Sequence, residues 1–319
     1  MITRREFGKL TLAGLAFPAT TARVSVDSGI SGSIAGADNV VAGVRLGVQT
    51  YSFRDLARPG NGSNAVQTII SAMGNCGLTE CELFAPQIEP PVSTARGQRG
   101  GQLAAEPLSR DDLRRWRLET PLDHFRAIKD TFAAAGIAIY AYNYSPNQSF
   151  SDEEIDRGFE MTRALGAEII TASTTLDVAA RIKPFAERHK MVVAMHGHSR
   201  VDDPNEFATP ESFAAAMKMS PFFTVNLDIG HFTAGNYDAI AYIREHHANI
   251  TNLHLKDRKR NQGDNVPWGE GDTPIRQTLQ LLKKERWPIR AYIEYEYRGA
   301  GSPVEEVKKC YAFAQQALA

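Results

Sequence analysis

The sequence predicts a single α/β domain folded as a closed (β/α)8 barrel, and three observations carry this prediction. Eight short apolar segments recur between residues 45 and 296. Stretches with the apolar spacing of helices alternate with them, as in a chain of strand–helix units. The 319 residues, 43% of them apolar, can bury the large core that eight such units share.

The expected elements follow in order along the chain. Strands are expected at residues 45–51, 80–84, 137–142, 167–172, 191–196, 223–228, 250–255 and 290–296. Helices are expected at roughly 64–75, 121–135, 152–164, 177–188, 210–218, 236–247, 274–286 and 303–318. Glycine just past a helical segment, as at Gly136 and Gly166, is typical of a helix end. An open doubly wound sheet is the alternative, but the turn at 52–55 lacks the glycine-rich phosphate loop of that fold.

The first residues predict an export signal. Arg4 and Arg5 precede a short apolar run and then small residues, which is the layout of a signal peptide. The pattern resembles a twin-arginine signal, with Gly8 where a large apolar residue is usual, and implies export machinery as a partner and a periplasmic or secreted protein. The alternative is a cytoplasmic protein with an incidental basic N-terminus. We expect the signal at 1–22 or extending to 37, a linker at 23–43 and the barrel at 44–319.

One connection is much longer than the others. About 35 residues at 86–120 follow the second expected strand, rich in Pro, Gly, Gln and Arg at first and charged later. A loop after a barrel strand lies at the face that carries the active site. We therefore expect either a lid over the site or a passive insertion.

Charge and cysteine content limit the classes of partner. The formal net charge is −1, which does not indicate the basic surface of a nucleic-acid binder. No segment is apolar for long enough to span a membrane. The three cysteines, Cys76, Cys81 and Cys310, lack the spacing of metal ligands and are expected to be structural. A small polar substrate is the expected partner, and the number of subunits is not predicted.

Polar side chains gather where the last four expected strands end, and catalytic groups of such barrels come from these ends. They are His196, His198, Asp228, His231, His254, Lys256, Glu294 and Glu296. Residues two apart on a strand face the same side, so each strand can direct a pair of them into the barrel mouth. Two imidazoles and two carboxylates are the ligands expected of Zn, Mn, Co or Fe rather than of Ca or Mg. The alternative is a structural cluster without a metal.

Six short segments in the same order carry a resemblance to a known family. They are GVQTYSFRD (47–55), CELFAP (81–86), NLDIGHF (226–232), NLHLKDR (252–258), PWGEGD (267–272) and YIEYE (292–296). From about Val44 to its end, the chain resembles the xylose-isomerase-like TIM barrels, the sugar phosphate isomerase/epimerase family. This resemblance implies one divalent metal ion bound by a residue from each of four strands.

The resemblance places the metal on His196, Asp228, His254 and Glu294. In the family the first of these positions usually holds a glutamate, and in its ketose epimerases two metal-binding glutamates also exchange the substrate protons. A histidine at 196 can bind metal and act as a base, but it breaks the paired-glutamate mechanism. The catalytic candidates are therefore His196, Glu294, Glu82, Lys256 and Glu296.

Four further residues are expected to bind substrate. His231 matches a family position that contacts substrate oxygens near the metal, and Arg260 is matched to a basic group that does the same. His198 is expected to contact substrate or to support the metal ligands, with a buried hydrogen-bonding role as the alternative. Trp268 could stack on the face of a sugar.

These residues predict a divalent-metal-dependent isomerase or epimerase acting on a keto sugar or related carbohydrate through an enediolate. One alternative is a lyase that eliminates a β-leaving group from a 3-keto glycoside. Another is a sugar-binding barrel without activity. Export favours a free sugar, keto sugar or glycoside over a sugar phosphate. A DNA-repair endonuclease of the same fold would need more metal ligands and a basic surface.

Overall fold

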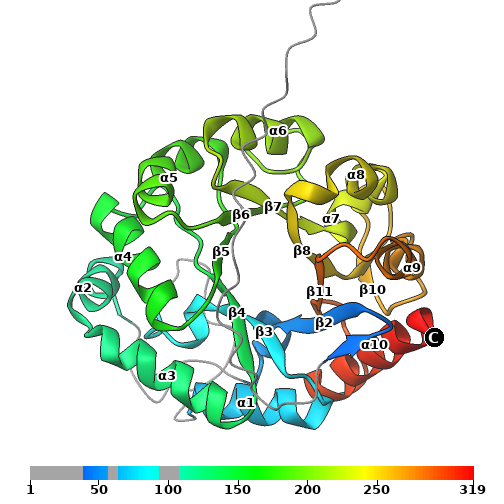
Figure 1. Cartoon of the computed structure of the whole chain (residues 1–319), viewed down its shortest axis with the longest axis horizontal. Coiled ribbons are helices and arrows are strands. Elements are labelled where there is room, and N and C mark those ends of the chain that lie inside the picture. The colour runs from blue at the N-terminus through cyan, green and yellow to red at the C-terminus, as the bar shows by residue number, and fades with distance from the viewer. Residues whose placement is uncertain (1–38, 57–63, 93–107) are drawn as a thin grey trace, which may run out of the picture. The chain divides into compact units, whose positions relative to one another are not determined.

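Eight parallel strands close into a barrel in the computed structural model, which describes residues 39–56, 64–92 and 108–319 (Figure 1). Each strand pairs with the next in chain order, and the last pairs with the first. The strands are β2 (Val44–Gln49), β3 (Glu80–Phe84), β4 (Ala138–Asn143), β5 (Ile169–Ala172), β6 (Val193–His196), β7 (Phe223–Asp228), β8 (Ile250–Leu255) and β11 (Arg290–Ile293). The predicted (β/α)8 barrel is confirmed.

Helices occupy the connections and surround the strands in Figure 1. They are α1 (Ala65–Cys76), α2 (Arg110–Glu119), α3 (Leu122–Ala134), α4 (Asp152–Ala164), α5 (Leu176–His189), α6 (Pro210–Met219), α7 (Ile229–Ala234), α8 (Ala239–His246), α9 (Ile275–Glu285) and α10 (Pro303–Leu318). Ser151 and Ser302 begin α4 and α10 with capping boxes, which satisfy the first free backbone amides. The two short helices α2 and α7 were not expected from the sequence.

Side chains fill the amino end of the barrel. Glu80 accepts hydrogen bonds from the Tyr292 hydroxyl at 2.7 Å and from Arg290 Nε at 3.1 Å. The Arg290 guanidinium lies 3.4 Å from the centre of the Tyr140 ring. Gly47 makes room for this packing, because a Cβ there would lie 2.4 Å from the Tyr292 ring. The cavity described below lies at the opposite, carboxyl end of the strands.

Structure begins before the end of the expected linker at 23–43. Val40–Val41 forms a strand, β1, antiparallel to β2. Asn39 is buried, and its side-chain amide donates to the carbonyl of Gly77 at 2.7 Å. A two-residue strand has no periodicity, which is why the sequence did not reveal it. The expected export signal, at 1–22 or extending to 37, lies outside the described residues.

The carboxyl part of the connection expected as a loop at 86–120 is helix α2. The sequence did not predict this helix, because the charged run at 110–119 has few apolar residues that could show a helical period. Arg117 of α2 is buried and pairs with Glu89 at 2.6 Å and with Glu154 of α4 at 3.2 Å. Residues 93–107 of this connection lie outside the described residues, so the expectation of a lid stays a prediction.

Glu154 joins α2 to α4 and carries our first prediction. Its carboxylate is fully buried and also pairs with Arg110 at 2.8 Å and Arg114 at 3.1 Å. Removing one partner of a buried ion pair leaves uncompensated charge, so Glu154→Gln should lower the free energy of unfolding in urea by about 3–5 kcal/mol. Glu153→Gln, at the exposed neighbouring position in the first turn of α4, is the control and should lower it by less than about 1 kcal/mol. Equal stability of the two variants would contradict this account.

This contribution also has a defined pH dependence. Burial raises the pKa of Glu154, but the hydrogen bonds and charges of Arg110 and Arg117 outweigh burial and hold the pKa below its ordinary value. The stabilisation is therefore present above the unfolded-state pKa of about 4.3 and is lost as the pH falls through the folded-state value.

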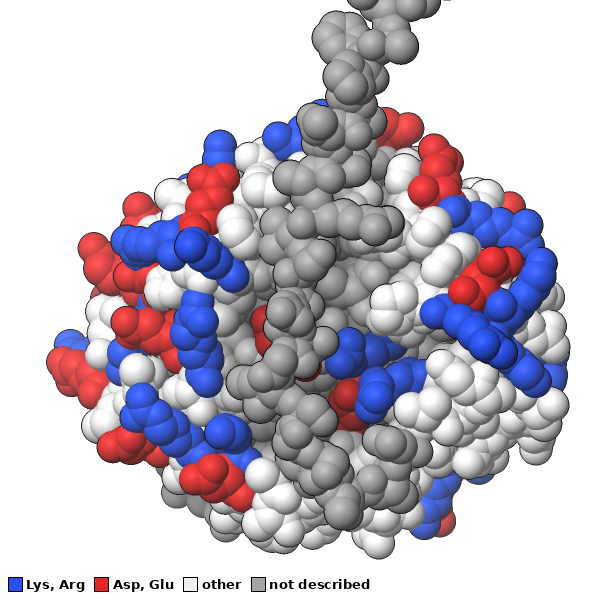
Figure 2. Space-filling view, in the orientation of Figure 1, with Lys and Arg blue, Asp and Glu red and all other residues white. Residues whose placement is uncertain are grey.

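Positive and negative side chains are interleaved on the face of the molecule shown in Figure 2. Among the described residues, no helix is both long and apolar enough to cross a membrane.

Candidate metal centre

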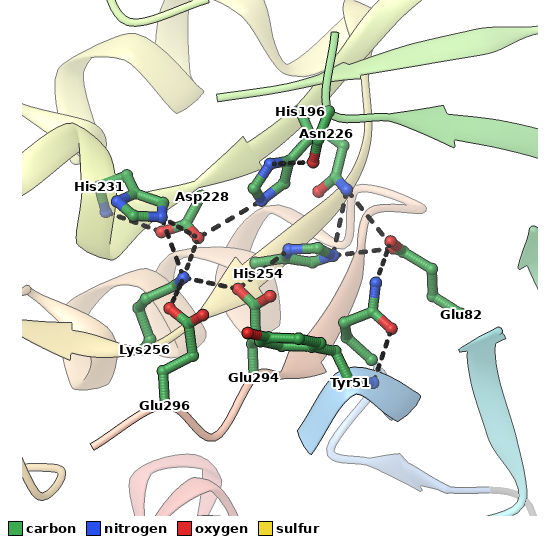
Figure 3. A network of polar contacts seen from close by, with 12 residues as sticks. Tyr51, Glu82, His196, Asn226, Asp228, His231, His254, Lys256, Glu294 and Glu296 are labelled. Carbon is green, nitrogen blue, oxygen red and sulfur yellow. Dashed lines mark hydrogen bonds and ion pairs between the residues drawn. The ribbon is translucent and has the colours of Figure 1, made fainter. Parts of the chain in front are cut away.

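A cavity of about 350 Å³ opens at the carboxyl ends of the strands. His196 ends β6, Asp228 ends β7, His254 lies near the end of β8, and Glu294 directly follows β11. The parallel register brings these ends level, since Asp228 and Tyr292 both lie beside His254. The sheet thus gathers four candidate ligands from four different strands (Figure 3).

These four side chains offer one ligand atom each within a small volume. One nitrogen from each histidine and one oxygen from each carboxylate all lie within 4.8 Å of one another. His196 Nε2 is 3.5 Å from Asp228 Oδ2, and His254 Nδ1 is 3.3 Å from Glu294 Oε2. All four side chains are buried.

One side-chain atom of each of these four residues lacks a hydrogen bond. His196 Nε2, Asp228 Oδ2, His254 Nδ1 and Glu294 Oε2 are buried, and none makes a hydrogen bond of acceptable geometry. The two carboxylate oxygens have an ion-pair partner, Lys256 Nζ, at 2.9 and 2.8 Å. Because a buried polar atom without a hydrogen bond costs about 1–3 kcal/mol, four such atoms close together still favour a shared ligand. A divalent transition-metal ion fits this set of two nitrogens and two oxygens.

Hydrogen bonds on the far side of each ring direct the histidines. Ser173 Oγ lies 3.2 Å from His196 Nδ1, and Glu82 Oε2 lies 2.8 Å from His254 Nε2. Each ring thereby turns its other nitrogen toward the cluster, as the outer partners of metal-binding histidines do. Burial holds the pKa of His196 below its ordinary value, which favours the neutral form that binds metal. Burial also disfavours charge on His254, but Glu82 and Glu294 outweigh it and hold its pKa well above the ordinary value.

The two carboxylate oxygens of Asp228 have different roles. Oδ1 accepts a hydrogen bond of 2.7 Å from the backbone amide of His231 and so caps helix α7. Oδ2 is left pointing at the cluster. The cap therefore fixes the orientation of the carboxylate before any ligand binds.

Lys256 is the cation beside the cluster. Its Nζ lies 2.9 Å from Asp228 Oδ2 and 2.8 Å from Glu294 Oε2, and it also pairs with Glu296. Burial lowers the pKa of Lys256, but these three carboxylates outweigh it and hold the pKa well above the ordinary value. Gly230 makes the approach possible, because a Cβ there would lie 2.3 Å from Lys256 Cγ.

The structure corrects the expected role of Glu82 as an acid or base. Its carboxylate is fully buried inside the barrel, where it accepts hydrogen bonds from side chains on five strands. The donors are Gln49, Asn143, Thr171, Asn252 and, at the longer distance of 3.4 Å, Asn226. Glu82 also contacts His254 Nε2. A carboxylate saturated in this way positions His254 and has no free lone pair for substrate.

Glu82→Gln should therefore weaken metal binding without abolishing it. We expect a 10–100-fold higher Kd for Mn²⁺ or Zn²⁺, about the loss seen when outer partners of metal ligands are changed. Glu80→Gln is the matched control, because Glu80 is a buried carboxylate on the same strand, two residues closer to its amino end. It should leave the Kd for metal unchanged, and an equal effect of both variants would contradict the assignment.

Three other expected residues do line the cavity. They are His198, His231 and Glu296. His198 Nδ1 lies 3.1 Å from Glu206 Oε2, which leaves its other nitrogen for a ligand. His231 Nδ1 lies 2.7 Å from Arg258 Nη1, and its Nε2 lies 3.1 Å from Lys256 Nζ. Burial lowers the pKa of both histidines, so they face the cavity as neutral rings.

The structure places the two remaining candidates elsewhere. Trp268 packs edge-on against Phe313 with ring centres 5.8 Å apart, and it is not among the described residues that line the cavity. The PWGEGD segment is instead built around Asp257, whose carboxylate accepts backbone hydrogen bonds from Gly269 and Gly271. Arg260 is exposed, and the arginine that contacts His231 is Arg258.

Sequence reasoning missed several residues of the cavity wall. They are Gln49, Tyr51, Phe84, Asn143 and Ser173. Four of them lie at or just past the ends of the first four barrel strands. The rule that strand ends carry the site, which was used for the last four strands, would have found them if it had been used for the first four as well.

The chain also matches a family model, described as the xylose isomerase-like TIM barrel, over residues 102–316. The chain belongs to this family. Among curated proteins, the L-ribulose-5-phosphate 3-epimerase UlaE of Salmonella paratyphi A is 28% identical over 100 residues, which are 31% of this chain. The matched segment spans 35% of the length of that relative.

Solved structures of other proteins share the barrel. The IolI protein, determined with a bound zinc atom, has a TM-score of 0.60 at 13% identity, covering 86% of this chain and 97% of that one. A sugar phosphate isomerase/epimerase from Parabacteroides distasonis has a TM-score of 0.57 at 17% identity, covering 88% and 97%. At these identities the similarity shows the fold.

Proposed function

We propose that the protein is a divalent-metal-dependent isomerase or epimerase that moves a proton at a carbon next to the carbonyl of a keto sugar or related carbohydrate. The observation that carries the proposal is the convergence of four buried ligand atoms that lack hydrogen bonds, three of them on residues that line a polar cavity. Membership of the xylose isomerase-like family supports the reaction class. Mn, Fe, Co or Zn would suit the two nitrogens and two oxygens.

A divalent ion held by His196, Asp228, His254 and Glu294 would make the C–H beside a carbonyl more acidic by stabilising the enediolate. Glu296 is the carboxylate that lines the cavity outside this ligand set, and we assign it the removal of the proton. The Lys256 ammonium faces the developing negative charge on the substrate oxygens. His198 presents a neutral ring that hydrogen-bonds a substrate hydroxyl and orients the sugar. His231, whose two nitrogens contact Arg258 and Lys256, lines the cavity beside it.

Proton exchange with solvent tests this proposal directly. The metal-loaded protein is incubated in D₂O with a panel of free keto sugars, and deuterium at the carbons beside the carbonyl is followed by NMR. We expect incorporation with the metal-loaded protein and none after chelation. Incorporation should slow by about 10²–10⁴-fold in Glu296→Gln, the range for loss of a general base. Glu270→Gln, at an exposed position, is the control. Absence of exchange with every keto sugar would contradict the proposal.

A second candidate is a lyase acting on a 3-keto glycoside, and the histidine at 196 favours it. The paired-glutamate exchange of ketose epimerases cannot operate with His196 in place of a glutamate, whereas elimination needs a single proton removal followed by loss of the leaving group. The two functions differ in their products. Release of the group attached to the sugar indicates a lyase, and its retention with deuterium incorporation indicates an isomerase or epimerase.

A further inference from the structure

We propose that the substrate has two parts, with a keto sugar in the metal cavity and a second sugar unit in an adjoining hollow. This inference rests on the proposed function and specifies its substrate class as a disaccharide or glycoside. The adjoining hollow has a volume of about 500 Å³. It is lined by Asp264, Asn265, Pro267, Glu296, Tyr297 and Arg298. We call it the second subsite.

Glu296 is the residue that links the two spaces. It lines both the metal cavity and the second subsite. In the close view, its side chain extends beside Lys256 at the edge of the ligand cluster (Figure 3). A ligand that occupies both spaces must therefore pass Glu296, which places its carboxylate next to the bond joining the two parts.

The second subsite contains polar groups that the protein itself leaves without partners. Asn265 Oδ1 is buried and accepts no hydrogen bond from the described residues. Asp264 and Arg298 are exposed, and neither side chain makes an ion pair with another described residue. A carboxylate, an amide and a guanidinium side by side can donate to and accept from neighbouring hydroxyl groups, as a sugar ring requires.

The charge of the second subsite favours a neutral ligand over a phosphate. The lining has two carboxylates, those of Asp264 and Glu296, and one guanidinium, that of Arg298, and Lys256 pairs with Glu296 from outside the lining. These charges balance, so the second subsite has no excess positive charge to attract a phosphate group, which carries close to two negative charges near neutral pH. A second sugar ring carries no charge and can hydrogen-bond all three side chains.

The walls of the second subsite are held in place without a ligand. Asn265–Val266 forms strand β10, which pairs with β9 (Asp257–Arg258). Asp257 accepts backbone hydrogen bonds from Gly269, Gly271 and Thr273 at 2.8, 3.0 and 3.2 Å, and so fixes the loop that follows β10. The Tyr297 hydroxyl donates to Glu306 at 2.8 Å. A preformed site of this kind loses little entropy when it binds a ligand.

Calorimetric titration of the full chain loaded with Mn²⁺ tests the proposal. The probes are fructose, three ketose disaccharides (lactulose, maltulose and isomaltulose), and fructose 6-phosphate. All five offer a ketose to the metal cavity and differ in what is attached to it. We expect at least one disaccharide to bind about tenfold or more tightly than fructose and than fructose 6-phosphate. In the double variant Asp264→Ala, Arg298→Ala this preference over fructose should fall at least about fivefold, whereas Arg244→Ala, an exposed arginine on α8, should retain it.

Three results would overturn the proposal. The first is binding of fructose with no disaccharide preferred over it, and the second is a preference that the double variant retains. The third is tightest binding of fructose 6-phosphate with loss of that affinity in the double variant, which would make the subsite a phosphate site. In each of these the proposed function stands, because a ketose still binds. Absence of binding by every probe would overturn the proposed function and this inference with it.

Discussion

Asp228→Asn should abolish metal retention while the barrel stays folded. The substitution removes the charge of the ligand oxygen Oδ2, but the amide oxygen of asparagine can still cap α7 through the backbone amide of His231. Loss of a direct ligand should exceed the 10–100-fold loss expected when an outer partner is changed. Metal content per chain, measured after desalting, and circular dichroism of the same sample test both halves of the prediction.

Asp228→Ala separates the two tasks of this residue. It removes both the ligand and the cap, so it should lose metal as fully as Asp228→Asn and also lose a further 0.5–2 kcal/mol of stability, the typical contribution of a helix cap. Full metal occupancy in either variant would show that Asp228 is not a ligand.

Lys256→Met should retain the metal but exchange substrate protons much more slowly. Methionine preserves much of the buried apolar stem that passes Gly230 but carries no charge to face the negative oxygens of an enediolate. We expect the rate of deuterium exchange from D₂O to fall by about 10²–10³-fold, the usual cost of removing one group that stabilises developing negative charge. Metal content should remain near that of the unmodified protein, because the carboxylates of Asp228 and Glu294 lose a competing cation.

The matched control is Lys259→Met, three residues further along the chain. Lys259 is exposed and bonds to the backbone carbonyl of Glu270, away from the cavity. Its loss should change neither metal content nor exchange. If Lys256→Met lost the metal as Asp228→Asn is expected to do, Lys256 would be a structural support of the ligands and not part of the reaction.

Much of the barrel could be predicted because its signals are local. A buried parallel strand such as Phe223–Asp228 is a short apolar run, and the polar residue that ends it marks the carboxyl edge of the sheet. His196, Asp228, His254 and Glu294 could be grouped for the same reason, since parallel strands bring their ends together. Their roles needed more than spacing, and came from the family resemblance.

The rest could not be predicted because it depends on which way a side chain turns. Glu82 lies on the expected strand, yet its carboxylate points into the barrel toward His254 and not into the cavity. Trp268 lies in an expected motif, but that motif is organised by backbone amides around Asp257, and the ring packs outward on Phe313. Helix α2 was not predicted because ion pairs anchor it to the rest of the barrel, and charged residues leave no apolar period in the sequence.

The central claim is that four residues hold one transition-metal ion, and elemental analysis tests it most directly. The protein is purified without chelators and assayed for Mn, Fe, Co, Ni, Zn and Mg. We predict close to one equivalent of Mn, Fe, Co or Zn per chain, lost in Asp228→Asn. No metal in the purified protein, and none taken up when these salts are added, would contradict the account.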